Sequence, residues 1–304
     1  MITIEQRAEF RKYFKNNHAS RLLVDRIIKI IVLGCVAISI VPLGSILFEV
    51  VRNGIPALTV DFFTQAPGAI GSDQPGGIGP AIQGTLMLIG LSSLIGVPIG
   101  VLGGIFLSEF GNNRIGNIIR FFNDVLAEFP TIVIGLFAFI MIVLTLGYFS
   151  IIGGMFALSI IMLPIITRTT EESLKLVPVT YREAGYALGV KRWIVITKIL
   201  LTSAKSGLIT GIMLAVARIG GETAPLIFTI LGSDQFFSGF DQPMDALPLR
   251  IWRLSLLPYD SATTQGWGGA LVLILIVLTL NIGVRYLFMR KQGGGGRVRI
   301  PAGG

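Results

Sequence analysis

Cysteine and histidine are nearly absent from this chain of 304 residues, in which Cys35 and His18 are the only residues of either type. A single cysteine excludes an intrachain disulfide framework and a cysteine metal site. His18 lies in a polar segment, which is typical of a solvated side chain. The sequence also lacks a Gly-x-x-x-x-Gly-Lys-Ser/Thr phosphate loop. We therefore expect no metal, no bound cofactor and no nucleotide site in this chain, and we do not expect an enzyme.

Charge is also scarce, since only 14% of the residues are charged and 52% are hydrophobic. The mean hydropathy is +0.77. This composition is typical of an integral membrane protein and excludes an ordinary soluble domain. The first apolar run, Ile30–Phe48, is too long for the core of a signal peptide, and no small-x-small cleavage site follows it.

Apolar runs of about 20 residues, the length that crosses a bilayer as a helix, recur along the chain. The 39 residues from Phe129 to Thr167 carry no charge and form two spans, with a turn at Gly147–Ser150 between them. We predict an all-α polytopic membrane protein with six spans, the other four being Ile30–Phe48, Ala81–Ser108, Ser206–Leu231 and Ser261–Val284.

Lysine and arginine predict the orientation of these spans, because they accumulate on the cytoplasmic side. Seven precede the first span, two follow the second, seven follow the fourth, and five flank or follow the last. The opposite side holds only Arg52, Arg250 and Arg253. Both termini are therefore predicted to be cytoplasmic. The net charge of +8 is explained by this topology, so nucleic-acid binding is not expected.

The chain is expected to contain one membrane domain, residues 27–291, with a large cytoplasmic loop at about 171–205. A basic cytoplasmic arm, 1–26, precedes the domain, and a flexible glycine-rich tail, 292–304, follows it. Glycines recur every four residues at 96, 100 and 104, and again at 207 and 211. Such stripes let helix backbones approach closely, so they predict tight helix packing within the chain or against another subunit.

Arg218 and Glu222 are the most unusual charges, because they lie within an apparent span. A charge near the bilayer centre costs about 2.5–3.5 kcal/mol on insertion scales, which makes a path for an ion or anionic solute the default hypothesis. Gly220, Gly221 and Pro225 predict a bend or an opening of this helix. The alternative is a structural ion pair that fixes helix packing. Arg168 is interpreted either as an interfacial side chain or as a second positive point on the path.

The largest inner loop contains Tyr181-Arg-Glu-Ala-Gly-Tyr-Ala-Leu-Gly189-Val-Lys-Arg-Trp193. Its spacing predicts a short amphipathic helix, ended by Gly189 in the left-handed conformation, and a restart at Lys191. Physical reasoning alone leaves open whether this helix lies at the membrane interface or docks a cytoplasmic partner. The segment resembles the EAA loop of ABC importer permeases. That resemblance implies that Glu183, Ala184, Gly185 and Gly189 couple the chain to an ATPase, although the family usually has alanine at 185.

Four further segments, Gly79–Thr85, Ile165–Glu172, Leu214–Leu226 and Pro243–Pro248, resemble the A-type permease subunits of phosphate-specific ABC importers. The resemblance covers roughly residues 25–290 and implies a type I importer architecture in the plasma (inner) membrane of a prokaryote. It implies a sibling permease, two ATPase subunits that bind the ATP, an extracytoplasmic phosphate-binding protein and membrane lipid as partners.

Under this resemblance, phosphate would follow a path past Arg218, Glu222 and Arg168. The rival functions are an ABC permease for another oxyanion, such as molybdate, tungstate or sulfate, and a proton-coupled secondary transporter that uses Glu222. The Gly-Glu-Thr-Ala-Pro segment at 221–225 favours phosphate over the other oxyanions, and the EAA loop argues against the secondary transporter.

Overall fold

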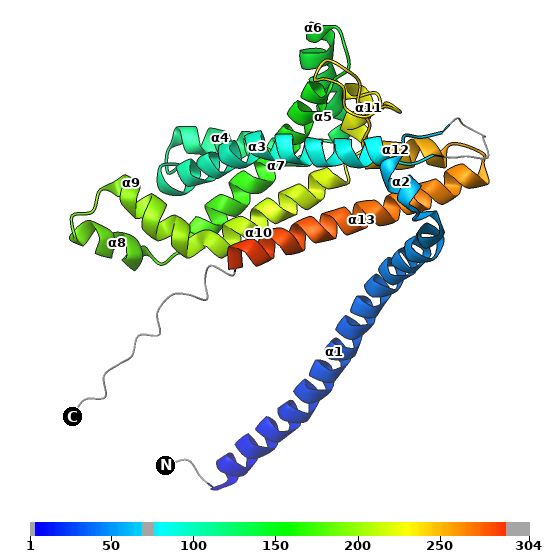
Figure 1. Cartoon of the computed structure of the whole chain (residues 1–304). Helices are drawn as coiled ribbons and strands as arrows, with labels where there is room; N and C mark the ends of the chain where they lie inside the picture. Colours follow the sequence, from blue (N-terminus) through cyan, green and yellow to red (C-terminus); the bar gives the residue numbers. More distant parts are fainter. Residues whose placement is uncertain (1–3, 69–75, 290–304) are drawn as a thin grey trace, which may run out of the picture. The chain divides into compact units, whose positions relative to one another are not determined.

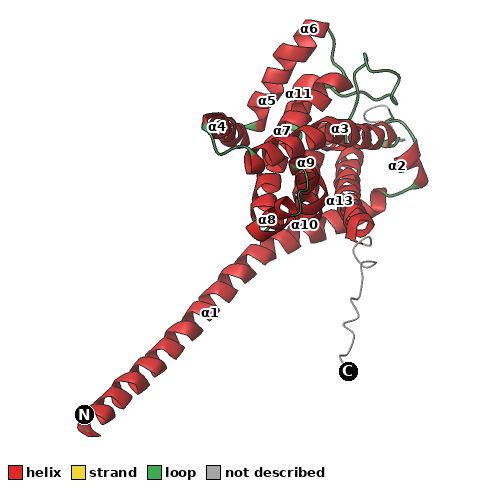
Figure 2. Ribbon diagram, turned by 90° about the vertical axis from the view of Figure 1, so that its left-hand side faces the viewer, coloured by secondary structure: helices red, strands yellow, loops and turns green. Residues whose placement is uncertain are grey.

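The computed structural model describes residues 4–68 and 76–289, and every regular element within them is a helix (Figure 2). The prediction of an all-α protein is confirmed. The predicted tail, 292–304, lies outside the described residues. The α-helices are α1 (Ile4–Gly54), α2 (Val60–Thr64), α3 (Gly79–Glu109), α4 (Arg114–Glu128), α5 (Thr131–Ala138), α6 (Leu144–Leu146), α7 (Ile151–Lys175), α8 (Val179–Ala187), α9 (Arg192–Ile194), α10 (Leu201–Gly220), α11 (Ala224–Thr229), α12 (Leu247–Ser255) and α13 (Asp260–Met289).

Five helical runs are long and apolar enough to cross a membrane, and a sixth crossing results if the bent pair α4 and α5–α6 is counted as one span. The five runs are Leu22–Ala57, Gly79–Glu109, Ile151–Lys175, Arg192–Gly220 and Asp260–Tyr286. The six-span prediction therefore agrees with the upper count. Gly147 has a φ of +83° and ends α6, which confirms the predicted turn between the third and fourth spans.

The first compact unit, Met1–Arg52, consists of most of α1. This helix begins at Ile4, so the residues predicted as a basic arm and those predicted as the first span belong to one continuous element. Its apolar side chains from Leu22 to Phe48 are exposed within the unit. Such a surface is typical of a helix that faces lipid or another subunit.

The second unit, residues 53–304, contains a bundle in which α3, α7, α10 and α13 run side by side (Figure 1). The loop helices α8 and α9 lie at one end of this bundle, and α2 and α12 lie at the other end. These are called the α8 end and the α12 end below. The main core lies between α3, α7, α10 and α11, and it includes Leu88, Met162 and Ile219.

The glycine stripes of α3 and α10 are the surfaces that contact α7. Gly96, Gly100 and Gly104 of α3 face Met162, Ile166 and Thr170 of α7. Gly207 and Gly211 of α10 face Ser173 and Thr169, which also belong to α7. The predicted close packing is thus confirmed, and it lies within the chain.

Gly104 provides a test of this packing, because a Cβ there would overlap the Thr170 side chain and lie 2.6 Å from the Thr167 carbonyl oxygen. We expect Gly104→Ala to destabilise the protein by about 1–3 kcal/mol, the usual cost of overpacking. The matched control is Gly90→Ala, since Gly90 lies on the same helix with nothing within 4 Å of its Cβ position. Alanine there should stabilise the helix by about 0.5–1 kcal/mol. Thermal unfolding of the purified chain in detergent measures both, and equal midpoints would contradict the proposed contact.

Two predicted spans differ from the structure. The third begins at a break: α4 and the run Thr131–Leu146 meet at 104° across Phe129 and Pro130, and only the bent pair together is long enough to count as a span. Pro130 has no N–H to donate, and the residue before a proline avoids the helical region, so the backbone turns there. The fifth run begins at Arg192, not Ser206, and ends at Gly220. Its first part lies in the segment that was assigned to a loop because it contains Lys198 and Lys205.

Candidate functional site

Arg218 and Glu222 form an ion pair at the point where α10 ends. Arg218 Nη1 lies 2.6 Å from Glu222 Oε1. The Glu222 side chain is 6% exposed, whereas the Arg218 side chain is 54% exposed. Among the described residues, Glu222 Oε1 has no donor at hydrogen-bonding geometry. The pair therefore consists of a buried acid and a basic group whose guanidinium also reaches the protein surface.

The backbone opens between the two charges, as predicted. Helix α10 ends at Gly220, Gly221 follows it, and α11 begins at Ala224 with Pro225 in its first turn. Glycine disfavours a helix by entropy, and proline lacks the N–H that a continuing helix would need. The Glu222 N–H donates instead to the Ile219 carbonyl oxygen over 3.2 Å.

The break lies deep in the bundle. Gly220 packs against Ile89 of α3 and Val277 of α13, both of which lie well inside their helices. Arg218 is 26 positions beyond the start of its helical run at Arg192 and two positions before its end at Gly220. The neighbours of Gly220 place the break inside the bundle, next to the buried Glu222. Broken helices at this depth are typical of transport sites.

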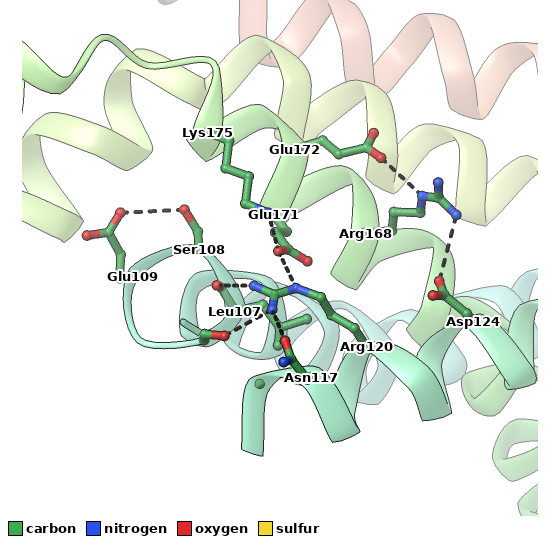
Figure 3. Close-up of polar contacts among 12 residues, drawn as sticks. Leu107, Ser108, Glu109, Asn117, Arg120, Asp124, Arg168, Glu171, Glu172 and Lys175 are labelled. Carbon is green, nitrogen blue, oxygen red and sulfur yellow. Dashed lines mark hydrogen bonds and ion pairs between the residues drawn. The ribbon is translucent and has the colours of Figure 1, made fainter. Parts of the chain in front are cut away.

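Arg168 lies on α7 with its own acidic partners. Its Nε donates to Glu172 Oε1 over 3.0 Å, and Nη1 lies 3.8 Å from Asp124 Oδ1 (Figure 3). All three side chains are more than half exposed. The sequence predicted that the fourth span ends at Thr167, just before Arg168. Helix α7 instead continues past Arg168 to Lys175. The ion pairs described for Arg168 do not include Arg218 or Glu222.

The loop helix α8 has the predicted form. It runs from Val179 to Ala187, Gly189 follows with a φ of +72°, and the chain re-enters a helix at Arg192. Glu183 and Ala184 are exposed, whereas Gly185 is buried against Val195 and Ile199. The absence of a side chain at Gly185 lets α8 lie close to the start of the next helix.

One exposed face of α8, together with the residue that follows the helix, is apolar. It presents Tyr181, Ala184 and Leu188, the last with 82% of its surface exposed. Several exposed apolar side chains on one short helix are a feature of docking surfaces. Two of the residues predicted for coupling, Glu183 and Ala184, lie on the exposed surface of this short helix, and the two glycines shape it.

A second polar network, which the sequence did not indicate, organises the α12 end. Asp245 is fully buried and accepts a 2.5 Å hydrogen bond from Arg250 Nε. Arg250 Nη2 also donates to Asp234 Oδ1 over 2.5 Å. Burial raises the pKa of the Asp245 carboxyl, and the charge of Arg250 opposes that rise. Asp245 therefore cannot contact an external partner, although Asp234 is exposed.

The motifs at 79–85 and 243–248 interlock at this end. The Thr85 hydroxyl accepts a hydrogen bond from the Leu247 N–H over 2.8 Å, and Gln83 Oε1 accepts one from the Phe237 N–H over 3.0 Å. Gly84 lies directly against the Asp245 carbonyl oxygen. These contacts hold the loop before α12 onto α3.

Similarity to known proteins agrees with this architecture. Residues 96–291 match the family described as binding-protein-dependent transport system inner membrane component. The phosphate transport system permease protein PstA of Haemophilus influenzae is 42% identical over 284 residues, which cover 93% of this chain and 98% of that protein. The chain belongs to the PstA family of permeases.

A second relative and two solved structures give the same result. The probable PstA permease of Methanocaldococcus jannaschii is 39% identical to this permease over 88% of this chain and 94% of its own. In the solved MetNI methionine ABC transporter, one chain matches with a TM-score of 0.55 at 16% identity, covering 70% of this permease and 93% of that chain. A chain of a bacterial alginate ABC transporter matches with a TM-score of 0.54 at 18% identity, covering 90% and 99%. The permease therefore has the fold of ABC importer permeases and is a multi-pass membrane protein.

Proposed function

We propose that this permease imports inorganic phosphate as the membrane subunit of an ATP-driven transporter. The observation that carries the proposal is the Arg218–Glu222 pair at a helix break deep in the bundle of a PstA-family chain. The relatives are named as phosphate transport permeases, and the fold supports an importer.

The chemistry of the pair suits phosphate. A guanidinium stays protonated and can bind two phosphate oxygens through parallel hydrogen bonds. The half-exposed Arg218 offers such a donor set, while Glu222 keeps it neutralised when no anion is bound. Glu222 can also accept a hydrogen bond from a phosphate oxygen that carries a proton. Arg168 can serve as a secondary positive point on the path only when its acidic partners, Asp124 and Glu172, release it.

The exposed side of Arg218 implies that this chain supplies one wall of the path. A sibling permease supplies the other, so an isolated chain is not expected to transport. An extracytoplasmic phosphate-binding protein delivers the anion to the α12 end, where Asp234 and Asp241 are exposed. The remaining apolar sides of the long helices face lipid.

Energy comes from two ATPase subunits that dock on α8. Glu183 and Ala184 form part of the docking surface, Gly185 lets α8 pack on the following helix, and Gly189 turns the chain after it. The ATP is bound by these partners, and this chain holds no cofactor of its own. Lysine and arginine concentrate near the α8 end, so this end and both termini are cytoplasmic.

The test is phosphate uptake in cells that lack the gene. Expression of this chain should restore uptake of labelled phosphate at low external phosphate, and a large excess of sulfate or molybdate should not slow it. Co-purification of the ATPase and the sibling permease is checked in the same cells. Strong competition by molybdate or sulfate would favour the other oxyanions as substrate. An assembled complex that restores no phosphate uptake would refute the proposed substrate.

A further inference from the structure

The end of α3 is the meeting point of three arginines from different parts of the chain. Arg120 of α4 donates to the Leu107 and Gly111 carbonyl oxygens, each over 2.9 Å, and to Glu171 of α7 over 2.8 Å (Figure 3). This arginine caps the carbonyl end of α3, where positive charge is favourable, and ties it to α7.

The other two arginines come from the loop that contains α8. Arg182, within α8, donates from Nε and Nη2 to Glu109 Oε1 over 3.1 and 2.7 Å. Arg192, after α8, donates to the Glu109 carbonyl oxygen over 2.5 Å, and its guanidinium lies 4.1 Å from the centre of the Phe110 ring. The loop is thus attached to the last residue of α3 on both sides of Gly189.

The Arg182–Glu109 contact is well shielded from water, with the side chains 18% and 4% exposed. Arg182 also donates to the Leu174 and Val177 carbonyl oxygens, each over 3.1 Å. One guanidinium therefore joins α8, the end of α7 and the end of α3. A fixed planar fork of donors holds such a geometry better than a flexible ammonium would.

Helix α3 connects this joint to the candidate transport site. It is a single helix from Gly79 to Glu109, packed on α7 through its glycine stripe. Ile89, twenty positions before Glu109, contacts Gly220 at the break beside Arg218. Twenty residues of α-helix span about 30 Å. If the contacts between Arg182, Arg192 and Glu109 move, α3 therefore moves with them and shifts Ile89 against the break. Helix α3 is not adjacent to the α8 loop in sequence.

We propose that Arg182 and Glu109 are positioning residues that pass the movement of α8 to α3, and through it to the Arg218–Glu222 break. The proposal rests on the proposed function, since it assigns a second route for the coupling between ATPase and transport path. The direct route runs along the chain from α8 into α7 and α10. Through the Arg182–Glu109 contact, α3 moves together with α8.

The first test compares transport with ATP hydrolysis in proteoliposomes that contain the complete importer. Arg182→Gln and Glu109→Gln should each lower the phosphate imported per ATP by about tenfold, within the usual range of coupling between linked sites, while hydrolysis continues. Glu109→Gln keeps the hydrogen bonds from Arg182 to α7, so it separates coupling from simple helix capping. Arg114→Gln, an exposed arginine at the same end, is the control and should change neither quantity. An unchanged ratio in Glu109→Gln would overturn the proposal.

The second test follows the two helices directly. With Cys35 replaced by serine, nitroxide labels at Leu102→Cys and Ala187→Cys report the distance between α3 and α8. With Arg182 present, that distance should be the same in the nucleotide-free and ATP-trapped complexes. In Arg182→Gln it should differ between these two states by about 2 Å, the scale of helix shifts at interfaces. Equal changes with and without Arg182 would contradict this inference alone. Absent phosphate uptake by the unmutated complex would instead contradict the proposed substrate, because the label distances do not depend on it.

Discussion

Replacing Arg218 with glutamine is expected to reduce phosphate uptake by at least about 30-fold in an importer that still assembles. Removing one partner of a hydrogen-bonded charge pair costs about 2–5 kcal/mol, and each 1.4 kcal/mol is a factor of ten. Glutamine retains hydrogen-bonding groups but not the charge or the fork of parallel donors. The measurement is the initial rate of labelled phosphate uptake, normalised to the amount of assembled complex.

The buried partner of Arg218 makes a second variant necessary. In Arg218→Gln, the Glu222 carboxylate stays buried without its cation, which is destabilising, although less so than for a fully buried pair because Arg218 is half-exposed. The double variant Arg218→Gln/Glu222→Gln removes both charges and should recover stability and assembly. It should not recover uptake if Arg218 binds the anion. Restored uptake in the double variant would show that the pair has only a structural role.

The features that the sequence predicted correctly were those that depend on residues close together along the chain. The glycines at 96, 100 and 104 have one contact surface in the structure because residues four apart lie on the same side of a helix. Gly189 ends α8 with a positive φ, as its place after an amphipathic segment predicted. The interrupted helix after Gly220 was also predictable, since Gly221 and Pro225 both oppose helix continuation.

Hydropathy could not give the ends of the third and fifth spans. It measures whether a segment tolerates an apolar environment, and it does not register whether the backbone continues as one helix. The charge-free run from Phe129 looks like an ordinary span, yet Pro130 turns the chain by 104° away from α4. The charges of Lys198 and Lys205 suggested a loop, yet long lysine side chains can lie along a helix and keep their ends in water.

The polar joints at the two ends of the bundle were not predictable because their partners are far apart in sequence. Glu109 and Arg182 are separated by 73 positions, and no spacing rule links them. Thr85 and Leu247 are 162 positions apart. Resemblance marked the segments around Thr85 and Leu247 as informative, but it did not indicate that they touch.

Loss of Arg250 is expected to be the most destabilising charge substitution at the α12 end. Arg250→Gln removes the cation that is hydrogen-bonded to the fully buried Asp245. Breaking a buried pair in this way costs about 3–5 kcal/mol, whereas removing both charges costs less. The double variant Arg250→Gln/Asp245→Asn should therefore be more stable than Arg250→Gln alone. Arg52→Gln, at an exposed position, controls for the loss of one positive charge. Thermal unfolding in detergent measures all three variants.

The same variant should acquire a distinct pH dependence. Burial raises the pKa of the Asp245 carboxyl, while Arg250, the Ala246 N–H and Arg253 lower it. Arg250 is the largest of these lowering influences, so its removal raises the folded-state pKa further. A carboxyl with a raised folded-state pKa stabilises the fold at low pH, and that stabilisation is lost as the pH rises through this pKa. The stability deficit of Arg250→Gln relative to the double variant, which has no carboxyl at 245, should thus grow from acidic towards neutral pH. A pH-independent deficit in Arg250→Gln would mean that Asp245 does not depend on Arg250 for its charge.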